Sequence, residues 1–139
     1  MSDDVPQNQC LTLGIDHLGL TVQLDKTLAF FVDGLGWKQV GEKPAYPAAF
    51  VSDGKSTLTL WQAKADQPIG FNRQNNIGLH HLAFKVANEA QLNILFNRIK
   101  NWPDLKVEFA PEFSGAGPKV HFMINEPSGN RIEFAYDPR

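Results

Sequence analysis

The feature that most constrains this chain is an internal near-repeat: residues 14–22 read GIDHLGLTV and residues 78–86 read GLHHLAFKV. The two segments align without a gap, and in each the apolar residues recur at every second position. This period is typical of a strand that buries one of its faces. A repeated strand indicates two similar modules, and the sequence leaves open whether they pair within one chain or between two.

A helical pattern follows each copy of the repeat. Apolar residues recur at helical spacing, first at Leu28, Phe31 and Leu35 and then at Leu92, Leu95, Phe96 and Ile99. Three further strands are predicted in each module, at residues 37–40, 48–52 and 56–62 and at residues 106–110, 120–125 and 131–136. The predicted fold is therefore α+β, with the order βαβββ occurring twice.

These patterns divide the chain into module 1 at about residues 12–62, a polar linker at about 63–77 and module 2 at about 78–137. A chain of 139 residues with 42% apolar and 20% charged residues is typical of one globular domain. Residues 111–119 show no periodicity, and we expect them to form a mobile loop over the mouth of a cavity.

Composition excludes several classes of partner. The net charge is −2, and no two Lys or Arg residues are adjacent, which argues against nucleic acid. The longest apolar run, residues 28–32, is far shorter than the roughly 20 residues that span a membrane. Cys10 is the only cysteine, so no internal disulfide can form, and we expect a reducing, cytoplasmic location.

The alternation also places a second set of side chains on the face opposite the core, where we expect a cavity. Its four symmetry-related positions hold His17, Thr59, His81 and Glu133, and three of these are metal-ligand types. Two imidazoles and one carboxylate can bind a divalent ion and leave positions for two substrate oxygens. Any one of the three taken alone is better explained as an ordinary strand or surface residue, but their symmetric placement favours a site.

Other residues are predicted on the same face. His121 is a candidate proton carrier, or else a partly exposed strand histidine. Trp61 is a candidate wall of a substrate site, although core or dimer-interface packing explains it equally well. The predicted substrate contacts are Thr59, Trp61 and Met123, and the predicted catalytic residues are Glu133 and His121.

The segments IDHLGLTV, HHLAFKV and EPSGNRIEF, in doubled βαβββ order, resemble the vicinal oxygen chelate superfamily over about residues 13–137. This superfamily includes glyoxalase I, methylmalonyl-CoA epimerase, fosfomycin-resistance transferases, extradiol dioxygenases and bleomycin-resistance proteins. The resemblance implies an open cup around one divalent metal ion (Fe, Mn, Ni or Zn), held by His17, His81 and Glu133. It also implies a small-molecule substrate and a homodimer.

The chain departs from individual members of the superfamily. Glyoxalase I has a Glu at the position of Thr59, and a Thr hydroxyl is a poor metal ligand and no general base. Extradiol dioxygenases have a Tyr and a His where this chain has Met123 and Asp66, and fosfomycin transferases have a Thr at Gly19. We therefore expect a metal-dependent enzyme acting on a small oxygen-rich substrate; a binding protein of the bleomycin-resistance type, without catalysis, is the alternative.

Overall fold

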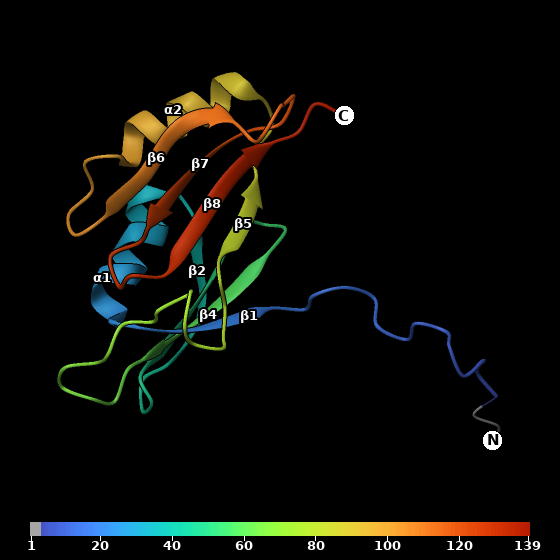
Figure 1. The fold of residues 1–139 in the computed structure, drawn as a ribbon. Helices are drawn as coiled ribbons and strands as arrows, with labels where there is room; N and C mark the ends of the chain where they lie inside the picture. The colour runs from blue at the N-terminus through green and yellow to red at the C-terminus, as the bar shows by residue number, and fades with distance from the viewer. Residues whose placement is uncertain (1–3) are drawn as a thin grey trace.

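The computed structural model describes residues 4–139, which form two similar sheets (Figure 1). The elements are β1 (Leu18–Val22), α1 (Leu24–Ala29), a π-helical turn η1 (Phe30–Gly34), β2 (Lys38–Lys43), β3 (Ala48–Ser52), β4 (Thr57–Gln62), β5 (Leu82–Lys85), α2 (Glu89–Ile99), β6 (Lys106–Phe113), β7 (Val120–Asn125) and β8 (Arg131–Tyr136). Each sheet has four strands, in the orders β1-β4-β3-β2 and β5-β8-β7-β6. The prediction of an α+β fold with two βαβββ modules is confirmed.

Each sheet combines parallel and antiparallel strands in the same way. Its first strand runs parallel to its last, β1 to β4 and β5 to β8, and the remaining pairs are antiparallel. A parallel pair needs a long connection between its strands. Here a helical segment and two strands connect β1 to β4, and likewise β5 to β8. Within residues 4–139, no helix has the length and apolar character that crossing a membrane requires.

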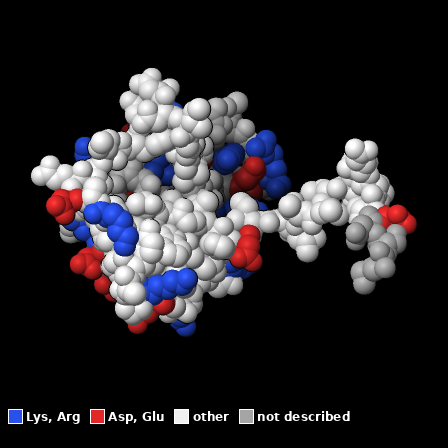
Figure 2. Space-filling view, turned by 90° about the horizontal axis from the view of Figure 1, so that it is seen from below, with Lys and Arg blue, Asp and Glu red and all other residues white. Residues whose placement is uncertain are grey.

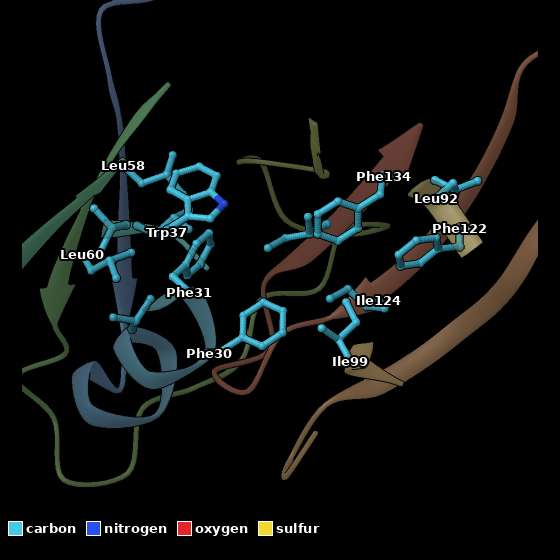
Figure 3. Close-up of a cluster of buried hydrophobic side chains, with 14 of the residues drawn as sticks. Phe30, Phe31, Trp37, Leu58, Leu60, Leu92, Ile99, Phe122, Ile124 and Phe134 are labelled. Atoms are coloured by element: carbon cyan, nitrogen blue, oxygen red, sulfur yellow. The ribbon is translucent and has the colours of Figure 1, made fainter. Parts of the chain in front are cut away.

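One apolar core joins the two modules. The strand faces predicted to be apolar are buried: Leu58 and Leu60 of β4 are 2% and 0% exposed, and Ile132 and Phe134 of β8 are 0% and 3% exposed. Aromatic rings lie between the two sets (Figure 3). The Trp37 ring lies 5.2 Å from that of Phe84, and the Phe30 ring 6.0 Å from that of Trp102, so each pair joins module 1 to module 2.

A buried polar contact also joins the modules, between α1 and the turn that links β7 to β8. Glu126 is 1% exposed, and its Oε2 accepts a hydrogen bond from Thr27 Oγ1 at 2.6 Å. Its Oε1 accepts hydrogen bonds from the backbone N–H groups of Ser128 and Asn130. We call Glu126 and Thr27 the inter-module latch.

Several strand boundaries differ from the prediction, and those of β1, β5 and β6 bear on the candidate site and the predicted loop. β1 begins at Leu18 and β5 at Leu82, so His17 and His81 lie just before the strands rather than within them. β6 extends to Phe113, because its last two residues still pair with β7. The expectation of an irregular loop from residue 111 is therefore wrong for residues 111–113; the remaining tip is closed by a hydrogen bond from Ser114 N–H to Lys119 O.

An extended arm precedes β1 and runs away from the body of the molecule (Figure 1). Residues 4–17 contain no helix or strand, and Leu13 and Ile15 are 103% and 86% exposed. Ile77, the repeat equivalent of Leu13, is also exposed. In the view of Figure 2 the arm is mostly uncharged, while Lys and Arg alternate with Asp and Glu on the body. The arm thus presents apolar side chains that no other part of residues 4–139 covers.

Candidate functional site

Strand register defines the face of each sheet that lies opposite the core. In the first sheet Gly19 pairs with Thr59, and Thr59 pairs with Phe50. In the second sheet Ala83 pairs with Glu133, and Glu133 pairs with Met123. Thr59 and Glu133 therefore occupy equivalent positions on the two last strands, as the repeat predicts. We call these two surfaces the cavity faces, after the cavity that the sequence predicts.

Glu133 is the centre of a polar cluster on the cavity face of the second sheet. Its side chain is 9% exposed, and its two oxygens contact different partners. Oε2 lies 2.6 Å from His121 Nδ1 and 3.9 Å from Lys119 Nζ, and Oε1 lies 3.3 Å from His81 Nε2. Donor atoms that share a metal ion with bonds of about 2.0–2.2 Å lie about 3 Å apart. His81 and Glu133 thus lie at an ion-pair distance, which two ligands of one ion can also have.

His17 does not lie with this pair. Its Nδ1 contacts the Asp16 carboxylate at 2.8 Å, and its side chain is 52% exposed. In the part of the chain that the structure describes, residues 4–139, no three His, Cys, Asp or Glu side chains are placed so that they could hold a metal ion. The structure thus brings together two of the three predicted ligands within one chain, because the modules meet through their apolar core and not through their cavity faces.

The predicted substrate contacts divide between the two sheets. Thr59 and Trp61 lie together on the first sheet, where Trp61 Nε1–H donates a hydrogen bond to Thr59 Oγ1 at 2.9 Å. Met123 lies on the second sheet beside Glu133 and is 5% exposed. His121, predicted to point toward Glu133, does so, and its ring lies 4.8 Å from that of Phe109.

A second charged cluster lies next to Glu133. Arg131 binds Glu108 through two hydrogen bonds, of 2.7 and 2.8 Å, so its guanidinium is already neutralised. The hydrogen bond from Arg131 holds the pKa of Glu108 below its ordinary value. The sequence gives no signal for Glu108, because the register between β6 and β7 shifts at this point.

His80 completes this cluster. Its Nδ1 lies 2.8 Å from His81 Nδ1 and 3.3 Å from Arg131 Nη1. Loss of hydration and the positive charge of Arg131 hold the pKa of His80 below its ordinary value. The alternation predicts that His80 faces the core, but the side chain is exposed because β5 begins only at Leu82.

Comparison with solved structures supports the fold. A lactoylglutathione lyase from Agrobacterium tumefaciens superposes with a TM-score of 0.67 at 23% identity, covering 91% of this chain and 96% of that one. A glyoxylase/bleomycin resistance protein/dioxygenase domain from Frankia sp. EAN1pec gives a TM-score of 0.78 at 19% identity, covering 92% and 94%. A glyoxalase family protein from Enterococcus faecalis gives 0.68 at 20% identity, covering 88% and 97%.

Comparison of the sequence with curated proteins and with family models identifies the family of the chain. No curated protein sequence matches the chain. The family model described as the glyoxalase/bleomycin resistance protein/dioxygenase superfamily matches residues 14–134, which cover nearly all of both modules and include all of the predicted site residues. The chain therefore belongs to the glyoxalase/bleomycin resistance protein/dioxygenase superfamily.

Proposed function

We propose that this protein is a metal-dependent enzyme that acts on a small, oxygen-rich substrate bound to one divalent ion. The observation that carries the proposal is the distance of 3.3 Å between His81 Nε2 and Oε1 of the Glu133 carboxylate, whose side chain is 9% exposed. His17, the third proposed ligand, comes from a second copy of the chain. Nitrogen and oxygen donors of this kind suit Fe, Mn, Ni or Zn.

The chain's own residues have distinct roles in this proposal. A bound divalent ion would act as a Lewis acid on the substrate oxygens. His121 hydrogen-bonds one Glu133 oxygen and so orients the carboxylate while the other oxygen faces His81. His121 is also the candidate proton carrier. Thr59 offers neither a carboxylate nor a base, so the proposed reaction differs from that of an enzyme with a carboxylate at this position.

The surface of the isolated chain supports a homodimer. A folded monomer of 15.5 kDa exposes about 7,200 Å², whereas this chain exposes 9,511 Å². The excess of about 2,300 Å² is larger than the roughly 800 Å² that each partner buries in a standard interface. The exposed apolar residues of the arm and of the segment before β5 contribute to it: Leu11, Leu13, Ile15, Ile77 and Leu79. In a two-fold dimer these equivalent segments can cover each other.

Mixing two defective variants tests the shared metal site. His17→Ala and Glu133→Ala should each lose the one divalent ion per chain that the wild-type protein binds. If the variants are unfolded and refolded together, half of the dimers are mixed, and each mixed dimer has one intact site. Metal analysis of the mixture should then give about one quarter of the wild-type content. His80→Ala, which removes a neighbouring histidine proposed not to bind metal, is the control.

Two results would contradict the proposal. Full metal content in either single variant would remove that residue from the ligand set. No recovery in the mixture, although both variants dimerise, would place the complete site within one chain. A cytoplasmic location, argued from the single thiol of Cys10, belongs to the same proposal.

The alternative is a binding protein of the bleomycin-resistance type, which holds a ligand without catalysis. The half-buried Trp61 on the cavity face of the first sheet favours it, because an indole can provide much of the contact area of a small ligand. Ligand binding that is equally tight with and without metal, together with no turnover of the ligand, would support this alternative over the enzyme.

A further inference from the structure

We propose that the cavity face of the first sheet binds a flat aromatic carboxylate, with Trp61 as the stacking surface and Lys43 as the cation that attracts the carboxylate. This inference deepens the proposed function by naming the substrate class, and it rests on that function only for the reaction, not for the binding. Its evidence lies in module 1, apart from the cluster around Glu133.

Strand register places these residues on one surface. Trp61 of β4 pairs with Ala48 of β3, and Ala48 pairs with Lys43 of β2. Neighbouring residues in such a row point to the same side of a sheet. Ala48 has only a methyl group, so little separates the indole from the lysine. The Lys43 ammonium lies 5.7 Å from the centre of the Trp61 ring.

The aromatic rings around Trp61 are held in defined orientations. The Tyr46 ring lies 4.7 Å from that of Trp61 in an edge-to-face arrangement, and the Phe50 ring lies 6.1 Å away, tilted by 53°. The hydrogen bond from Trp61 Nε1–H to Thr59 Oγ1 also restrains the orientation of the indole ring. The polar atom of the indole is thus satisfied, while the residue remains half-buried, and its ring can contact an apolar ligand.

The basic residues distinguish a small anionic ligand from a protein partner. The Lys64 ammonium lies 3.9 Å from the centre of the Tyr46 ring and donates to the Tyr46 carbonyl oxygen, so two ammonium groups flank the aromatic cluster. Lysine is depleted at the centre of protein interfaces because burying its charge is costly. A carboxylate attached to a ring satisfies both parts of this surface, the aromatic part and the charged part.

Gly19 keeps the surface beside Trp61 accessible. A Cβ atom at this position would lie 3.1 Å from Thr59 Oγ1 and 3.5 Å from Trp61 Nε1. Any larger residue would therefore press against the hydrogen bond that orients the indole. Glycine at this place in β1 leaves that edge of the ring open.

Binding of benzoate to protein freed of metal with EDTA tests the inference. Titration calorimetry should show tighter binding of benzoate than of benzyl alcohol, which lacks the charge, or of acetate, which lacks the ring. Trp61→Leu should weaken benzoate binding about three- to tenfold, the range expected for loss of an aromatic contact. Lys43→Met should weaken benzoate binding about two- to fivefold. The difference in affinity between this variant and the wild-type protein should be smaller in high salt, because salt screens the attraction between Lys43 and the carboxylate.

Matched controls and a second measurement keep the test decisive. Phe113→Leu and Lys55→Met replace an exposed aromatic residue and an exposed lysine elsewhere, and benzoate affinity should be unchanged in both. In the wild-type protein, benzoate should shift the indole N–H resonance of Trp61 but not that of the buried Trp37. No preference for benzoate over benzyl alcohol, or an unshifted Trp61 resonance, would overturn the inference.

The same proteins separate this inference from the proposed function. Trp61→Leu should retain the metal content of the wild-type protein, because Trp61 is not a proposed ligand. Benzoate binding in a protein that takes up no metal would leave the inference standing and reject the metalloenzyme. Metal binding without any benzoate binding would reject the inference alone.

Discussion

Replacing Glu126 with alanine should destabilise the protein strongly, because backbone N–H groups of the β7–β8 turn would lose their acceptor. The Glu126 carboxylate accepts four hydrogen bonds: from Thr27 Oγ1 and from the Ser128 N–H, Asn130 N–H and Asn130 Nδ2–H groups. Thr27 Oγ1 also lies 2.6 Å from Ser128 Oγ, so this hydroxyl can find another partner. Among the described residues, the Ser128 and Asn130 backbone N–H groups have Glu126 Oε1 as their acceptor, and both lie in partly buried residues.

The size of the effect follows from these two backbone groups. A buried donor that loses its acceptor costs about 1–3 kcal/mol. Two such donors predict that Glu126→Ala lowers the free energy of unfolding by about 2–6 kcal/mol. Glu126→Gln retains one carbonyl oxygen for the turn and should cost less than half as much. Glu42→Ala, which removes an exposed carboxylate of β2, should stay within about 0.5 kcal/mol of wild type.

Urea denaturation followed by far-ultraviolet circular dichroism measures all three variants on one scale. A double-mutant cycle with Thr27→Val should also give a coupling free energy of about 0.5–3 kcal/mol between Thr27 and Glu126. A loss below about 1 kcal/mol in Glu126→Ala, or equal losses in Ala and Gln, would refute the argument that orphaned donors set the cost. A coupling of zero would show that the latch does not join the modules energetically.

Three further predictions concern the surface and the site. The pKa of Glu108 is lowered by its hydrogen bond with Arg131, so the stability it contributes is present above its ordinary value of 4.5 and is lost as the pH falls below it. The difference in melting temperature between wild type and Glu108→Gln should accordingly be clear at pH 7 and vanish in acid. Leu13→Ser combined with Ile15→Ser should shift the protein toward monomer in analytical ultracentrifugation, whereas Val40→Ser, another exposed apolar position, should not. Isomerisation of a glutathione hemithioacetal to the thioester should be undetectable in the wild-type protein, because Thr59 stands where glyoxalase I has a Glu; turnover at roughly 1–1,000 per second would contradict this.

The sequence by itself determined the local and repeated features of this protein. The period of two in GIDHLGLTV and GLHHLAFKV indicates which faces of β1 and β5 are apolar, because alternation is a property of each strand alone. The same period in the closing strands predicts that Thr59 and Glu133 are equivalent, and the strand register confirms it. The family resemblance rests on the same repeated segments.

Only the tertiary structure decided where the strands end and how the modules meet. His17 and His81 lie outside the hydrogen-bonded strands, and their directions depend on neighbours such as Asp16 and His80 rather than on alternation. The separation of His17 from Glu133 follows from packing between the modules through Trp37 and Phe84. Such contacts join residues that are far apart in the sequence, and a periodic pattern shows that a face is apolar without showing which other face it will cover.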